Sequence, residues 1–156
     1  MRILQKYLNS NKNYNIKTAS FNILKNCEIK GGVSITLNPS NSNDIIFEYK
    51  ALAPNWRLWN DFKKKKISEE YFVKEYKEML SQLNSKHVLE HLNFLTGGIE
   101  PILMCSCAKT KFCHRHLVAD WLEKERGIII QELNFPELSR KNGYLVKRKN
   151  PSLFPE

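Results

Sequence analysis

Residues 99–130 read IEPILMCSCAKTKFCHRHLVADWLEKERGIII, and this stretch determines the fold class. The apolar run at its start predicts a buried strand over 101–105. Residues 113–126 predict a helix, and Gly127 is suited to cap its C-terminal end. The apolar residues of this helix recur on one face, at Leu117, Val118, Trp121 and Leu122. A further buried strand is predicted over 128–132, so the stretch forms a right-handed βαβ unit with parallel strands.

The first third of the chain predicts a second passage of the same kind. A short strand over 16–19 precedes a brief helix, and period-two alternation of apolar residues predicts another strand over 33–37. Between the two passages, amphipathic patterns predict helices that begin near Pro54, Ser68 and Ser85.

The four predicted strands favour a single sheet, because the chain between them carries few hairpin signals. We therefore expect an α/β fold with a small, mainly parallel sheet flanked by helices, in a Rossmann-like arrangement of three layers. Residues 1–133 are predicted to form one domain, and residues 134–156 a basic C-terminal tail that is partly irregular.

The composition is that of a basic globular protein. Of the 156 residues, 42% are hydrophobic and 26% are charged, and 25 Lys and Arg against 16 Asp and Glu give a formal net charge of +9. This excess favours anionic partners, either a small molecule or nucleic acid, although a basic solvated exterior explains it equally well. No apolar run approaches the roughly 20 residues of a membrane helix, and no secretion signal is evident. We expect a cytoplasmic protein that does not engage a membrane, with its four cysteines as free thiols.

The end of the predicted strand 101–105 and the start of the following helix are expected to form a binding site. Ligands of open parallel sheets bind beyond the carboxyl ends of the strands, where Thr18 and Ser20 also lie. A helix N-terminus offers free N–H groups and a positive dipole, and Arg115 adds a bidentate donor. Thr18, Ser20 and Arg115 are therefore predicted to bind a phosphate or carboxylate.

The cysteines and histidines of this segment have three interpretations. In an enzyme, Cys105 or Cys113 would be the nucleophile, and His114 or His116 the base. In a zinc site, the three clustered cysteines would be ligands together with one of the two histidines, which gives the set Cys105, Cys107, Cys113 and His116. In a structural role, the cysteines would pack as small apolar residues. The spacing C-x-C-x5-C-H-x-H differs from the usual pair of C-x2-C zinc knuckles.

Two tryptophans flank Arg57, close to the basic run Lys63 to Lys66. Interleaved aromatic and basic residues can grip single-stranded nucleic acid by stacking and phosphate contact. The alternative is that Trp56 and Trp59 pack their helix onto the sheet.

The sequence resembles the bacterial domain-of-unknown-function family numbered 488, in its short and often phage-associated form. The resemblance is carried by Lys50 to Trp56, by Leu103-Met-Cys105, and by Cys113-His-Arg-His-Leu-Val-Ala-Asp-Trp-Leu122, within a similarity over residues 16–133. It implies a compact α/β domain without an assigned activity. The family-like set is Cys105, Cys113, His114 and Arg115, whereas Cys107 departs from the family pattern.

These observations favour a small cytosolic enzyme, a Cys/His-dependent transferase or hydrolase. Its substrate would be anionic, either nucleotide-like or derived from nucleic acid, and bound in a crevice of cysteine, histidine and arginine residues. The alternative is a non-catalytic module that binds zinc or nucleic acid. Arg115 is expected to line this crevice with Cys105 and, as an arginine in the first turn of a helix, to be solvated and to add little to stability. Arg115→Ala would then spare the fold, whereas Trp121→Ala would destabilise it.

Overall fold

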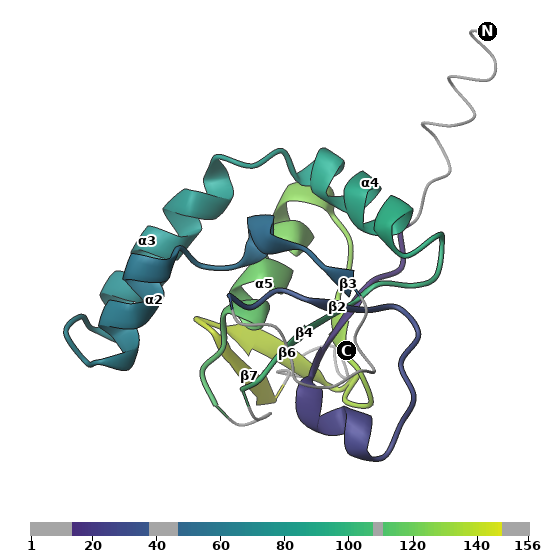
Figure 1. The fold of residues 1–156 in the computed structure, drawn as a ribbon, viewed down its shortest axis with the longest axis horizontal. Coiled ribbons are helices and arrows are strands. Elements are labelled where there is room, and N and C mark those ends of the chain that lie inside the picture. The colour runs from purple at the N-terminus through teal and green to yellow at the C-terminus, as the bar shows by residue number, and fades with distance from the viewer. Residues whose placement is uncertain (1–13, 38–46, 108–110, 148–156) are drawn as a thin grey trace, which may run out of the picture.

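The computed structural model describes residues 14–37, 47–107 and 111–147 (Figure 1). Residues 1–13 of the predicted domain and residues 148–156 of the predicted tail lie outside the described residues. The main sheet has five strands in the order β3-β2-β4-β1-β5, and every pair is parallel. The strands are β1 (Lys17–Ser20), β2 (Gly32–Ser34), β3 (Phe47–Glu48), β4 (Ile102–Cys105) and β5 (Gln131–Glu132). The prediction of one mainly parallel sheet is confirmed, and β3 is an edge strand that the sequence analysis did not predict.

Within the described residues, four α-helices and two 3-10 helices accompany these strands. They are η1 (Phe21–Lys25), η2 (Lys50–Leu52), α2 (Trp56–Lys63), α3 (Glu69–Ser81), α4 (Ser85–Leu95) and α5 (His114–Arg126). Local capping sets where α3 begins, because the Ser68 hydroxyl accepts a hydrogen bond from the backbone N–H of Tyr71 at 3.1 Å. At the end of α5, Gly127 adopts the left-handed conformation that favours glycine, as predicted.

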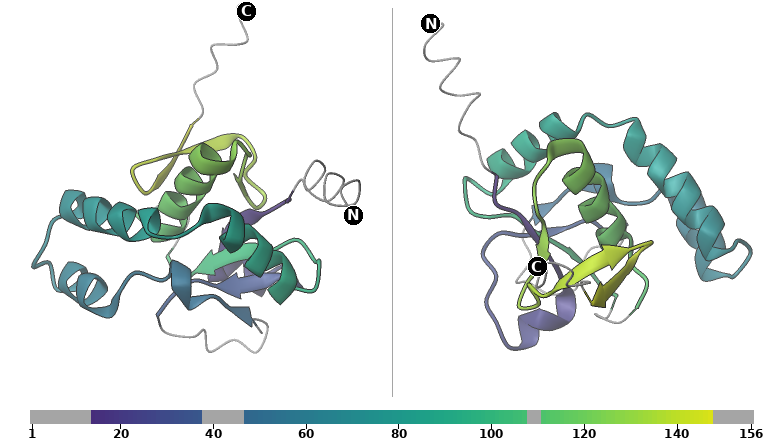
Figure 2. Two further views of the ribbon diagram at one scale, coloured as in Figure 1. Left: turned by 90° about the horizontal axis from the view of Figure 1, so that it is seen from above. Right: turned by 180° about the vertical axis from the view of Figure 1, so that it is seen from behind.

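The two faces of the sheet are covered unequally. Strand β4 lies at the centre and alternates between the faces, with Leu103 in the large core under the α-helices and Met104 in a small cluster beneath η1. A strand that is buried on both faces explains why residues 101–105 are apolar without polar alternation. The η1 residues and the α-helices therefore cover opposite faces of the sheet, and η1 lies apart from the α-helices in the view from behind (Figure 2). The predicted three-layer α/β architecture is therefore confirmed, and one outer layer is thin.

A β-hairpin follows the main sheet, in the segment for which a partly irregular tail is expected. Its strands β6 (Leu138–Lys141) and β7 (Tyr144–Lys147) are antiparallel and joined by Asn142 and Gly143. Both turn residues have positive φ, as an Asn-Gly hairpin turn requires. The hairpin packs against α5, so it adds residues to the region where the predicted site lies. Within the described ranges, no helix is both long enough and apolar enough to cross a membrane.

Candidate functional site

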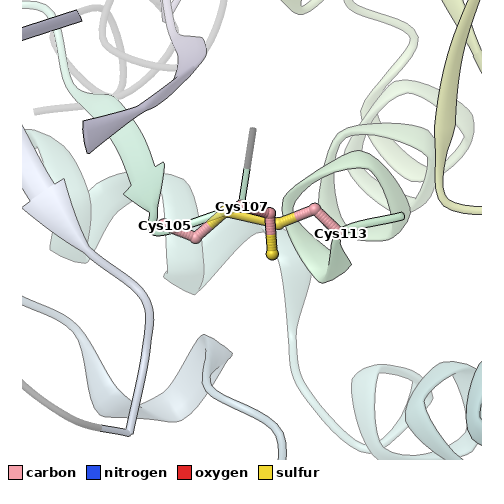
Figure 3. A group of neighbouring side chains, drawn as sticks. All are labelled: Cys105, Cys107 and Cys113. Atoms are coloured by element: carbon pink, nitrogen blue, oxygen red, sulfur yellow. A yellow bond between two sulfur atoms is a disulfide. The ribbon is translucent and has the colours of Figure 1, made fainter. Parts of the chain in front are cut away.

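The end of β4 and the start of α5 meet at two cysteines. Cys105 is the last residue of β4, and Cys113 is the N-cap of α5. The Cα atoms of the two residues lie 7.7 Å apart and their sulfur atoms form a disulfide, which Figure 3 shows between the strand and the helix. The expectation of four free thiols is therefore wrong for this pair. In a βαβ unit the helix begins at the carboxyl edge of the sheet, where the preceding strand ends, and this brings the two thiols together although eight positions separate them.

Cys107 is the third cysteine at this position. Its sulfur lies beside the disulfide (Figure 3), and the three sulfur atoms are all within 4.8 Å of one another. Cys107 is a free thiol and is half-buried, whereas Cys105 and Cys113 are buried. Burial raises the pKa of the Cys107 thiol, and the positive charge of Arg115 opposes that rise in part. His116, the fourth ligand of the zinc interpretation, is not in this group of ligand atoms.

Arg115 is the most deeply buried charged residue of the site, with an exposure of 0%. Its Nε donates to Oε1 of Glu132 at 3.2 Å, and its Nη2 donates to Oε2 at 2.9 Å, which forms a bidentate ion pair. Its Nη1 donates to Sγ of Cys105 at 2.9 Å and to the carbonyl of Cys107 at 3.1 Å. Arg115 thus faces Cys105, as predicted, but the expectation that its guanidinium is solvated is wrong, because β5 places the Glu132 carboxylate opposite the first turn of α5.

A second buried arginine comes from the hairpin. The guanidinium of Arg140 lies 3.6 Å from the Glu132 carboxylate, and its Nη2 donates to the Thr18 hydroxyl at 2.8 Å and to the Ile130 carbonyl at 3.1 Å. The Thr18 hydroxyl in turn donates to Oε1 of Glu132 at 2.6 Å. Burial lowers the pKa of Arg140 to about 10, against the opposing effect of Glu132, so the group is still charged at neutral pH. One carboxylate therefore faces two guanidinium groups, and Thr18 joins them.

The two histidines of the segment have different surroundings, and both are buried and neutral. Nε2 of His114 donates to the Ile35 carbonyl at 2.6 Å, which leaves Nδ1 unprotonated at 4.0 Å from Sγ of Cys113. Burial lowers the pKa of His114 to about 4. Nδ1 of His116 accepts a hydrogen bond from Nη1 of Arg140 at 2.5 Å. Burial also lowers the pKa of His116, and its Nε2 has no hydrogen-bond partner among the described residues.

Ser20 is the remaining predicted residue, and it borders a pocket. Its hydroxyl accepts a hydrogen bond from the backbone N–H of Asn22 at 3.3 Å and so caps η1. A pocket of about 510 Å³ lies between η1 and the residues after β5. Its polar lining is formed by Ser20, Asn22, Asn26, Cys27, Glu132 and Asn134. In register, Ser20 is the partner of Cys105 on the neighbouring strand, so the pocket is adjacent to the cysteine cluster.

The predicted residues are thus brought together, but in a buried cluster rather than in an open crevice. Thr18, Cys105, Cys113, His114 and Arg115 are all buried, and Ser20 lines the pocket beside η1. Glu132 and Arg140 belong to this cluster but are not among the site residues predicted from the sequence. Glu132 could have been found from the sequence, because it is an acidic residue at the end of an apolar strand. A buried acidic residue requires a partner of opposite charge or hydrogen bonds. Arg140 carried no signal, because it is one of many basic residues near the C-terminus.

The tryptophans near the predicted nucleic-acid motif have separate environments. Trp59 packs edge-on against Phe72 and His114, with ring centroids 6.2 Å apart in each case. Trp56 is 68% exposed. The packing alternative therefore holds for Trp59, whereas Trp56 lies at the surface beside Arg57.

The fold and the Cys105–Arg115 cluster define the class of protein as a small parallel α/β domain with a cysteine–arginine centre. The family model DUF488-N3a, described as the active DUF488-N3 subclade, matches residues 16–126. This match spans more than half of the chain, and the protein belongs to the DUF488 family. The match includes the cysteine cluster and Arg115 but ends before Glu132 and Arg140. No curated protein and no solved structure matches the chain.

Proposed function

We propose that this protein is a cysteine-dependent enzyme, a transferase or hydrolase, in which Cys105 in its reduced form is the nucleophile. The observation that carries the proposal is the contact of 2.9 Å between Nη1 of Arg115 and Sγ of Cys105. A guanidinium keeps its charge in a protein, and a thiol that contacts it is favoured in the thiolate form, which is the reactive form.

The charge balance of the cluster supports the same assignment. Two buried guanidinium groups, those of Arg115 and Arg140, contact the carboxylate of Glu132, while both histidines are neutral. The carboxylates of Glu123 and Asp120 also act on Arg140, whereas Arg115 has Glu132 as its ion-pair partner, so a further negative charge beside Arg115 is favoured. A Cys105 thiolate supplies that charge in the position that Arg115 already contacts.

His114 serves the second cysteine in this proposal. Its unprotonated Nδ1 faces Sγ of Cys113 at 4.0 Å, and the bond from Nε2 to the Ile35 carbonyl holds the ring in that tautomer. After reduction, Nδ1 can accept the Cys113 proton or return it to a leaving group. A base with a pKa of about 4 releases a proton readily, which suits the second of these roles.

The substrate class rests on the charge of the chain and on the adjacent pocket. The net charge of +9 favours an anionic substrate. The pocket beside Ser20 offers side-chain amides of Asn22, Asn26 and Asn134, which both donate and accept hydrogen bonds, together with the ring of Phe135. These groups suit the uncharged part of a nucleotide-like molecule, such as a planar base. Arg115 acts on Cys105 in this arrangement and does not contact the substrate.

The thiolate is tested by its ultraviolet absorbance near 240 nm, measured against pH on the reduced protein. We expect one thiolate to be present at neutral pH and to disappear in Cys105→Ser, whereas the matched variant Cys27→Ser keeps it. Unperturbed thiols ionise near pH 8.5, so a thiolate at neutral pH requires a stabilising partner. Equal absorbance at neutral pH in Cys105→Ser and wild type would refute the assignment.

A zinc site is the second candidate function, and the three neighbouring sulfur atoms are the observation that favours it. Three thiolates that bind zinc leave a fourth position for water or substrate, as in catalytic zinc sites. Elemental analysis of protein purified without chelators separates the two candidates. One equivalent of zinc that is lost in Cys107→Ser supports the zinc site, and less than about one tenth of an equivalent excludes it.

A further inference from the structure

We propose that the cysteine cluster carries out thiol–disulfide exchange, with Cys107 as the thiol that opens the Cys105–Cys113 disulfide and a small thiol as reductant. The three sulfur atoms lie within 4.8 Å of one another, and Figure 3 shows the Cys107 side chain beside the bond. The two bonded cysteines are buried and Cys107 is half-buried. A thiol from solvent therefore meets Cys107 before it meets the disulfide.

The exchange is an internal displacement that conserves the number of disulfides. The Cys107 thiol gives its proton to solvent, and its sulfur attacks Sγ of Cys113. A bond forms between Cys107 and Cys113 while the bond between Cys113 and Cys105 breaks, and Cys105 leaves with the electron pair as a thiolate. Exchange of this kind is faster when the departing thiolate is stabilised. Nη1 of Arg115, at 2.9 Å from Sγ of Cys105, supplies that stabilisation.

The same guanidinium positions both reacting residues. Nη1 of Arg115 also donates to the carbonyl of Cys107 at 3.1 Å, which holds the backbone of Cys107 next to the disulfide. Glu132 fixes Arg115 through two hydrogen bonds, so the guanidinium does not have to move during the exchange. One buried group thus contacts both the attacking residue and the departing sulfur. Because it stabilises Cys105 as the leaving thiolate, it favours attack at Cys113 over attack at Cys105.

The second stage consumes the reductant. The new disulfide includes the half-buried Cys107, which a small thiol can reach. Two equivalents of a monothiol, or one dithiol, reduce it to two thiols and leave as a disulfide. The products are Cys107 and Cys113 as thiols and Cys105 as a thiolate. The inference rests on the proposed function only in that this product is the proposed nucleophile; the exchange itself does not require Cys105 to act on any substrate.

The test is the rate at which dithiothreitol reduces the oxidised full-length protein. Samples are quenched with acid, alkylated and mapped by mass spectrometry, for wild type, Cys107→Ser and the matched control Cys27→Ser. We expect Cys107→Ser to slow the loss of the Cys105–Cys113 disulfide by at least about tenfold, because direct attack on two buried sulfur atoms is hindered, and Cys27→Ser to leave the rate unchanged. A Cys107–Cys113 linkage is expected among the quenched wild-type peptides.

An equal rate in wild type and Cys107→Ser would overturn the inference and assign the disulfide a structural role. Circular dichroism establishes that each variant is folded before its rate is measured, and Cys107→Ala is the second variant if the serine perturbs the fold. The thiolate absorbance of Cys105 is measured on the same samples after full reduction. A normal thiolate with unchanged exchange rates refutes the exchange alone, whereas Cys107-dependent exchange without a thiolate refutes the proposed nucleophile alone.

Discussion

Replacing Arg115 with Ala is expected to destabilise the fold more than replacing Trp121 with Ala. The guanidinium is 0% exposed and holds Glu132 through two charge-assisted hydrogen bonds. Its loss leaves a polar cavity and leaves the carboxylate with Arg140 at 3.6 Å and with the Thr18 hydroxyl. Breaking a buried ion pair by removing one partner costs about 3–5 kcal/mol, which is a large share of the 5–15 kcal/mol typical of a whole domain.

The cost of Arg115→Ala is compared with that of Trp121→Ala, because the sequence predicts that Trp121 is the more important of the two residues for stability. In the structure it is only partly buried at the edge of the core. Truncation of a fully buried tryptophan costs about 3–5 kcal/mol, so the cost for a partly buried one should fall below that range. The order of the two variants is therefore the reverse of the sequence-based expectation.

The assay is urea unfolding followed by far-ultraviolet circular dichroism, in a reducing buffer so that the disulfide does not contribute. Arg57→Ala is the matched control, because Arg57 is an exposed arginine on α2 and should change the unfolding free energy by less than about 0.5 kcal/mol. A loss of under about 1 kcal/mol for Arg115→Ala, with a larger loss for Trp121→Ala, would refute the assignment of Arg115 to a buried ion pair.

Three further predictions concern particular contacts. Because burial lowers the pKa of His114 from 6.5 to about 4, the unfolded chain binds a proton that the folded chain does not, and His114 should contribute a fall of roughly 3 kcal/mol in the unfolding free energy as pH drops through that interval, in addition to the contribution of His116. Urea titrations across the interval check this, and an equal slope in His114→Gln would contradict it. Gly143→Ala should lower the melting temperature, because φ is +92° and an added Cβ would collide with the ring of Phe112; an unchanged melting temperature would contradict this. Ser68→Ala removes the N-cap of α3 and should cost about 1 kcal/mol in urea unfolding, and rescue by Ser68→Asp is expected.

Much of the architecture was encoded in local sequence patterns. Helical spacing of apolar residues, Ser68 as an N-cap and Gly127 as a C-terminal cap act within a few residues, so the pattern alone located α3 and α5. The apolar runs at 101–105 and 128–132 indicated strands that are buried under helices, and the handedness of βαβ units made those strands parallel. The cysteine cluster followed from the same logic, because a strand end and the next helix start meet at one edge of the sheet.

The chemical state of the site depended on contacts that no local pattern encodes. Arg115 became a buried ion-pair partner because β5 lies beside β1, which places Glu132 opposite α5. Arg140 entered the cluster because a hairpin in the expected tail folds back onto α5. Composition and periodicity report how often apolar residues recur, but they do not report which charged side chains meet across neighbouring strands. A charge near a helix start is therefore read as solvated until the packing of distant elements removes it from water and supplies its partner.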